Sequence, residues 1–127
     1  MKQKLEMGAR ILLGLIYVIF GLNFFFQFIP MPPPPENMGA LMGALMSTGY
    51  MMYLVKMIEI VCGALLIANL FVPLSMILLA PITINIFLIH LMMAPAGLGL
   101  AIPMVVLTAI VAWARWSQFQ PVLKMKN

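Results

Sequence analysis

Four long apolar segments constrain this chain more than any other feature of its sequence. Each contains roughly 20 residues, the length that an α-helix needs to cross the hydrocarbon core of a bilayer. The first shows no small-residue cleavage site of a secretory leader. We therefore predict one all-α membrane domain over residues 1–127, a four-helix transmembrane bundle with spans at 8–29, 50–70, 73–93 and 99–116.

The composition excludes a water-soluble domain. Hydrophobic residues make up 65% of the chain and charged residues 8%, whereas a soluble domain has about 25% charged residues. The net charge of +4 does not indicate a nucleic-acid partner, because most basic residues lie at the two ends of the chain, where positive charge sets membrane topology. The single cysteine, Cys62, excludes an intrachain disulfide and a C-x-x-C couple.

The segment between the first two spans is predicted to pack against the bundle without crossing the bilayer. Residues 30–35 are rich in proline and favour a stiff, extended strap. Residues 37–48 place methionine and leucine on one helical face and small residues on the other. This segment is too short to span, so we expect an interfacial or re-entrant helix between the first and second spans. Residues 117–127 are expected to form a basic tail.

The orientation follows from the number of crossings and the charge at the ends. Four spans bring both termini to one side, and the excess of lysine and arginine makes that side cytoplasmic. Residues 30–49 and 94–99 then face outward. We expect a multi-pass protein of the cell inner (plasma) membrane, in contact with the lipid bilayer.

Lys56 and Glu59 cost the most free energy to place in a membrane, because they are charged residues within an apolar segment. At i and i+3 they share one face of a helix. Charged side chains in hydrocarbon normally turn inward, pair with each other and mark a functional pathway. We therefore predict that Glu59 is the centre of a functional site. The alternative is a packing clamp, in which Lys56 only neutralises Glu59.

Other polar side chains are expected at a similar depth. Counting 1.5 Å per residue from the outer ends of the helices places three of them about 10–13 Å below the outer edge of the membrane: Asn23, Glu59 and Asn85. Three more lie about one turn higher: Lys56, Gln27 and His90. We expect an outward-opening cavity with Glu59 at its floor and His90 near its mouth. Asn85 and His90 are about 140° apart around a helix, so both reach one pocket only if Pro81 kinks and rotates that helix.

Arg10 and the methionines have simpler explanations. Glu6 and Arg10 are at i and i+4, so we expect them to pair at the cytoplasmic end of the first span, where Arg10 anchors the topology or enters the core. A methionine stripe in 37–48 would suit Cu(I), but methionine also fills gaps in apolar cores and occurs throughout this chain. The chain has one histidine and no catalytic triad, so we assign no metal site and no self-contained catalytic centre.

Several short motifs occur in a defined order between residues 8 and 92. They are RILLGLIYVIFGLNF from Arg10, TGY from Thr48, KMIEIVCG from Lys56, PL from Pro73, PI from Pro81, and then Asn85 and His90. In this order they resemble the DoxX family. The resemblance implies a four-helix membrane bundle and an association with quinone-linked oxidoreductase complexes, although some eukaryotic relatives look like assembly chaperones. The site residues that it implies are Arg10, Asn23, Glu59, Asn85 and His90.

Three functions stay open on these observations. The first is a subunit of a membrane oxidoreductase system that binds a quinone or another small amphipath. Glu59 and His90 would handle protons, and the ligand contacts would be Asn23, Lys56, Asn85, Gln27 and Arg10. The second is an accessory or chaperone protein that binds a partner's transmembrane helices. The third is a small proton-coupled transporter, which would need to form a homo-oligomer.

Overall fold

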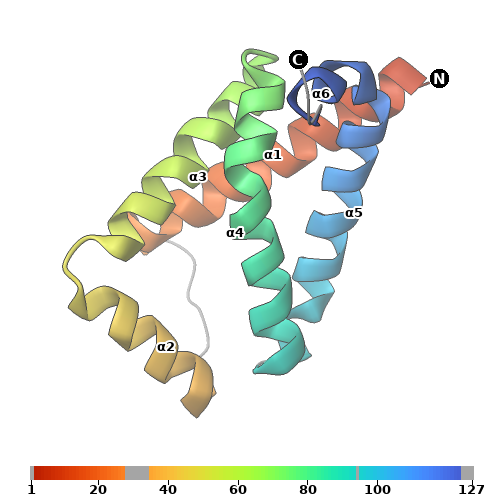
Figure 1. Cartoon of the computed structure of the whole chain (residues 1–127). Helices are drawn as coiled ribbons and strands as arrows, with labels where there is room; N and C mark the ends of the chain where they lie inside the picture. The colour runs from red at the N-terminus through yellow and green to blue at the C-terminus, as the bar shows by residue number, and fades with distance from the viewer. Residues whose placement is uncertain (1, 28–34, 94, 124–127) are drawn as a thin grey trace.

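The structure is a computed structural model that describes residues 2–27, 35–93 and 95–123 (Figure 1). Within these residues every regular element is helical, as predicted. The elements are α1 (Lys2–Phe26), α2 (Glu36–Ser47), α3 (Met51–Ala68), α4 (Val72–Met92), the short 3-10 helix η1 (Pro95–Gly97), α5 (Leu98–Ala114) and α6 (Trp116–Leu123). Most of the proline strap predicted at 30–35 lies outside the described residues; Pro35 caps the start of α2.

The observed helices differ from the predicted segments mainly at the two ends of the chain. α1 already begins at Lys2 and ends at Phe26, where Gln27 takes a left-handed backbone conformation with φ 52°. The first part of the predicted tail forms α6, which is bent by 85° from α5 at Arg115. Residues 124–127 of that tail lie outside the described residues.

A tight turn joins α3 to α4. Asn69 caps α3 in the left-handed conformation (φ 60°), which asparagine tolerates better than most residues. Pro73 stands in the first turn of α4, where its missing N–H would have no partner in the helix. The turn therefore sets α3 and α4 side by side.

Four helices pack around a shared core. α1 and α4 each pack against both α3 and α5. The core contains large side chains from all of them, including Leu13, Tyr17, Leu66, Leu79 and Val111. α1 and α3 are in close contact at Gly14 and Gly63, where a Cβ on either residue would lie 2.6 or 2.8 Å from the carbonyl oxygen of the other. Small residues at a crossing permit such close approach of two helices.

The outer surface of these helices is apolar. Exposed residues include Leu12 and Ile19 on α1 and Leu74 and Ile84 on α4. Within the described residues, α1, α3 and α4 are each long and apolar enough to cross a membrane, and α5 with α6 passes the same test as a bent pair. An exposed apolar surface of this extent matches lipid rather than water.

α2 is set apart from the other helices (Figure 1). It contacts α3, and none of its residues, all of which the structure describes, is buried. Met38, Leu41, Met42 and Leu45 are half-buried, while Ala40, Gly43, Ala44 and Ser47 on the other face are exposed. The predicted division into an apolar and a small-residue face is therefore present over most of α2, with the apolar face turned toward the protein. Two residues depart from it, because Met46 is exposed and Gly39 is half-buried.

Candidate functional site

A cavity of about 480 Å³ lies between α2 and the other helices. Its walls come from α1 to α5 and are largely apolar, with isoleucine, leucine, valine, phenylalanine and methionine side chains. The polar residues in the lining are Tyr17, Lys56, Glu59, Asn85 and His90. Four of these five are residues that the sequence singled out.

Lys56 and Glu59 form an ion pair in the wall of this cavity. Lys56 Nζ lies 3.4 Å from Glu59 Oε2, and the exposed fractions of the two side chains are 20% and 3%. Met52, Val55 and Glu59 recur at the spacing of one α3 face, and that face meets the cavity. The predicted pairing is confirmed, whereas the functional role of Glu59 stays a prediction.

Asn85 and His90 border the cavity from opposite edges of one α4 face. Ile82, Ile86 and Ile89 form the stripe between them, so both polar residues reach the same cavity although they are far apart around the helix. We predicted that both residues could reach one pocket only if part of the helix were rotated. Both line the cavity because the cavity extends across the whole α4 face between them.

Both of these side chains are also held by the α4 backbone. Asn85 Nδ2 donates to the carbonyl of Pro81 at 2.9 Å. His90 Nδ1 donates to the carbonyl of Ile86 at 2.7 Å, because a carbonyl oxygen can only accept. The His90 ring packs over Gly97, where it leaves no room for a Cβ.

Tyr17 is a site residue that the sequence reasoning did not single out. It lines the cavity and is 1% exposed, and its hydroxyl is hydrogen-bonded to Thr83 Oγ1 on α4. A signal was available, because a tyrosine in the middle of an apolar span needs a partner for its hydroxyl. Its position seven residues after Arg10 puts it on the same inward face of α1.

Three predicted ligand contacts are not part of this lining among the described residues: Asn23, Gln27 and Arg10. Asn23 is buried, but beyond Phe20 the end of α1 closes on the start of α3, where the rings of Phe24 and Tyr53 are 5.6 Å apart. Gln27 is exposed and follows the end of α1.

Arg10 lies at the other end of the molecule. Its Nη1 donates to the carbonyl of Leu66 at 2.5 Å. Leu66 follows Glu59 by about two turns of α3, or roughly 10 Å, so Arg10 cannot serve the same ligand head group as Glu59.

Arg10 instead belongs to a second polar cluster. Its Nε donates to Glu6 at 2.8 Å, which confirms the predicted pair. Arg115, at the end of α5, also donates to Glu6 at 2.9 Å and to Asn69 Oδ1 at 2.6 Å. Glu6 and Arg10 are both buried. This cluster ties the start of α1 to the ends of α3 and α5, and the sequence did not predict the part of Arg115 in it.

The cavity can hold a molecule with a large apolar part and a small polar head. Lys56 Nζ can donate to such a head group, and the Glu59 carboxylate can accept from it. The size falls in the range of about 300–1,000 Å³ that small-molecule sites occupy. Among the described residues, no group of three or more His, Cys, Asp or Glu side chains could hold a metal ion.

Comparison with known protein families gives a match over most of the chain. The family model described as DoxX matches residues 6–92, a range that includes all of α2, α3 and α4 and most of α1. No curated protein and no solved structure matches the chain.

Proposed function

The chain belongs to the DoxX family and is a small integral membrane protein; on this premise we propose that it binds a small amphipathic molecule of the quinone class in the cavity. The observation that carries the proposal is the Lys56–Glu59 pair in the wall of an otherwise apolar cavity. Charged side chains beside an apolar cavity within the membrane cost free energy. Contact with the polar head group of a ligand would give this pair a function.

The proposal includes a membrane layout with four crossings. α1, α3 and α4 cross the bilayer, and α5 crosses with them, because its residues Leu98–Ala114 extend for about 25 Å beside α1 and α4. Both termini then lie on one side, which is cytoplasmic because Lys2, Lys4 and Arg115 lie there. In a bacterial cell this membrane is the inner membrane, and α2 faces outward.

The cavity chemistry suits both oxidation states of a quinone. The carbonyl oxygens of the oxidised form accept hydrogen bonds, and Lys56 and the Asn85 amide are donors in the lining. The hydroxyl groups of the reduced form donate, and Glu59 accepts. Isoleucine and methionine side chains on the remaining walls fit the ring and the start of an apolar tail.

Glu59 and His90 are the residues that would exchange protons with the ligand. Reduction of a quinone to a quinol takes up two electrons and two protons, and a carboxyl group and an imidazole are suitable proton carriers. The electrons would come from a partner oxidoreductase, because the residues of this chain supply no redox couple of their own.

Ligand content of the purified protein tests this function. We expect quinone to copurify with the full chain in a mild detergent and to be detected by native mass spectrometry. Glu59→Gln should lower the bound fraction about tenfold or more, because a hydrogen bond to a charged group contributes about 1.5–3 kcal/mol. Glu36→Gln is the matched control, since Glu36 is exposed at the start of α2 and does not line the cavity.

Two results would contradict the proposal. One is a folded Glu59→Gln variant that retains the ligand at the wild-type level, which would make the ion pair a packing clamp. The other is a wild-type protein that neither copurifies with a quinone nor binds one added to nanodiscs. Thermal unfolding of each variant separates loss of ligand from loss of fold.

A second candidate function is that of an accessory protein for other membrane proteins. It is favoured by the small-residue face of α2, which is exposed; a Cβ on Gly43 would meet no described atom within 4 Å. Small residues let a partner's helix approach closely. This candidate predicts that Gly43→Leu releases a stoichiometric partner while Met46→Leu, also on α2, does not.

A further inference from the structure

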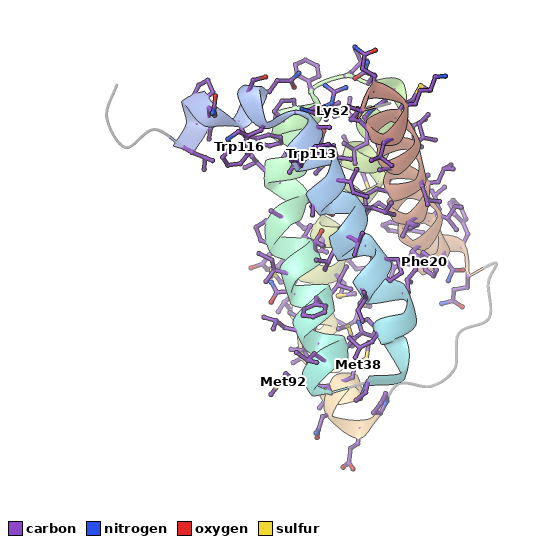
Figure 2. The ribbon with its side chains drawn as sticks, turned by 90° about the vertical axis from the view of Figure 1, so that its right-hand side faces the viewer. Lys2, Phe20, Met38, Met92, Trp113 and Trp116 are labelled. Atoms are coloured by element: carbon purple, nitrogen blue, oxygen red, sulfur yellow. The ribbon has the colours of Figure 1, made fainter. Side chains whose placement is uncertain are left out.

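The end of the molecule opposite α2 carries a short helix that is sharply bent from α5. α6 makes an angle of 85° with α5, and Trp113 and Trp116 lie at this end together with Lys2 (Figure 2). Phe119 is buried under α6, whereas Trp116, Val122 and Leu123 are 50–63% exposed. With α5 along the membrane normal, α6 lies close to the plane of the membrane.

This end of the molecule also has an excess of positive charge. Lys2 and Lys4 are exposed, and Lys2 Nζ lies 4.8 Å from the centre of the Trp113 ring, a cation–π contact. Among the described residues, Glu6 is the one acidic residue at this end of the molecule. Arg10 and Arg115 both pair with it. The two lysines therefore have no carboxylate partner among the residues that the structure describes here.

We propose that α6 lies in the membrane interface and that α6, Lys2 and Lys4 together form a binding surface for anionic phospholipid head groups. The proposal rests on the four-crossing layout given above, in which α5 crosses the bilayer. It does not depend on the ligand in the cavity.

The chemistry of the surface fits a lipid head-group layer. Indole rings favour the boundary between head groups and acyl chains, and the exposed Val122 and Leu123 can enter the upper acyl region, as the apolar side of an interfacial helix does. Each lysine near an anionic surface contributes about 1 kcal/mol, which corresponds to about a fivefold preference for anionic over zwitterionic lipid.

Depth-dependent quenching of tryptophan fluorescence tests the position of α6. The chain has two tryptophans, so Trp113→Phe leaves Trp116 as the sole reporter. In liposomes we expect Trp116 to be quenched more by lipids brominated near the head group than by lipids brominated near the end of the acyl chain. Stronger quenching by the deep bromines would mean that α6 completes a crossing, and an absence of quenching would mean that α6 projects into water; either result overturns the proposal.

The preference for anionic over zwitterionic lipid tests the role of the Lys2 and Lys4 charges. Brominated phosphatidylglycerol mixed into unlabelled phosphatidylcholine should quench Trp116 more than brominated phosphatidylcholine mixed into phosphatidylglycerol at the same fraction. The double variant Lys2→Gln/Lys4→Gln should reduce this preference at least fivefold, and Lys2→Arg/Lys4→Arg should retain it. Equal quenching by both lipids in the wild type, or an unchanged preference in the glutamine variant, overturns the proposal.

The cavity ligand is measured in the same samples. If no quinone binds but the anionic preference is present, the proposed function fails while the lipid surface stands. If the quinone binds but the preference is absent, only the lipid surface fails.

Discussion

At the scale of single residues, the Lys56–Glu59 pair allows function and stability to be separated. Glu59→Leu leaves the Lys56 ammonium without its partner, and removal of one member of a buried pair costs about 3–5 kcal/mol. Because the Lys56 side chain is 20% exposed, we expect the lower end, about 3 kcal/mol. The double variant Lys56→Met/Glu59→Leu should regain most of this stability and still not bind the ligand. Reversible unfolding in detergent and native mass spectrometry measure the two properties.

The alternative gives the opposite pattern for the same variants. If the pair only clamps the helix in place, the double variant should retain whatever ligand and partners the wild type has. A double variant as unstable as the single one would show that this site needs its charges for folding.

A second residue-scale prediction concerns Tyr17 and Thr83, which join α1 to α4 through one hydrogen bond. Tyr17→Phe and Thr83→Val should each destabilise the fold, and a double-mutant cycle should give a coupling energy of about 1 kcal/mol, somewhat above the average for such bonds in membrane proteins. Strictly additive effects in the cycle would mean that the two hydroxyls do not interact. Tyr53→Phe, at an exposed tyrosine on α3, is the control.

At the scale of helices, the crossing of α1 and α3 is set by glycine. A Cβ on Gly63 would lie 2.8 Å from the Gly14 carbonyl oxygen and 2.9 Å from a Val18 methyl carbon, so Gly63→Ala must push the two helices apart. We expect a loss of about 1–3 kcal/mol, the usual cost of overpacking. Gly8→Ala in α1 is the matched control, because its Cβ would meet no described atom within 4 Å. Equal stability of the two variants would contradict this account of the crossing.

The limits of sequence reasoning are clearest at this scale. The helices and the inward face of α3 follow from local rules, because apolar length and helical period determine them. The bend before α6 does not, since Arg115 is held there by Glu6 and Asn69, far away in the sequence. The same holds for Asn23: its depth could be counted, but the end of α1 turns toward α3, and only tertiary packing decides that.

Side-chain contacts between residues far apart in the sequence were not predicted, for the same reason. Tyr17 and Thr83 are 66 residues apart, and neither stands out among its neighbours until α1 and α4 are brought together. Lys56 and Glu59, by contrast, are on one helix and could be paired from their spacing alone.

At the scale of the whole molecule, two clusters of charged side chains lie at different levels of the bundle. The Glu6–Arg10–Arg115 cluster joins helix ends through strong contacts, whereas the Lys56–Glu59 pair borders a cavity. One cluster is satisfied by the protein itself, and the other has room for a ligand beside it. This difference explains why only the second is proposed as a binding site.

The proposed layout of four crossings makes a prediction for the two sides of the membrane. In a Cys62→Ala background, Ser47→Cys on α2 and Ser117→Cys on α6 each introduce one exposed thiol. A thiol reagent that does not cross membranes should label position 47 in intact cells and position 117 only after the membrane is opened. If α5 does not cross, both positions lie on one side and label together. The background protein itself should stay unlabelled, because its only cysteine, a buried one, has been removed; any signal there would invalidate the assay rather than the layout.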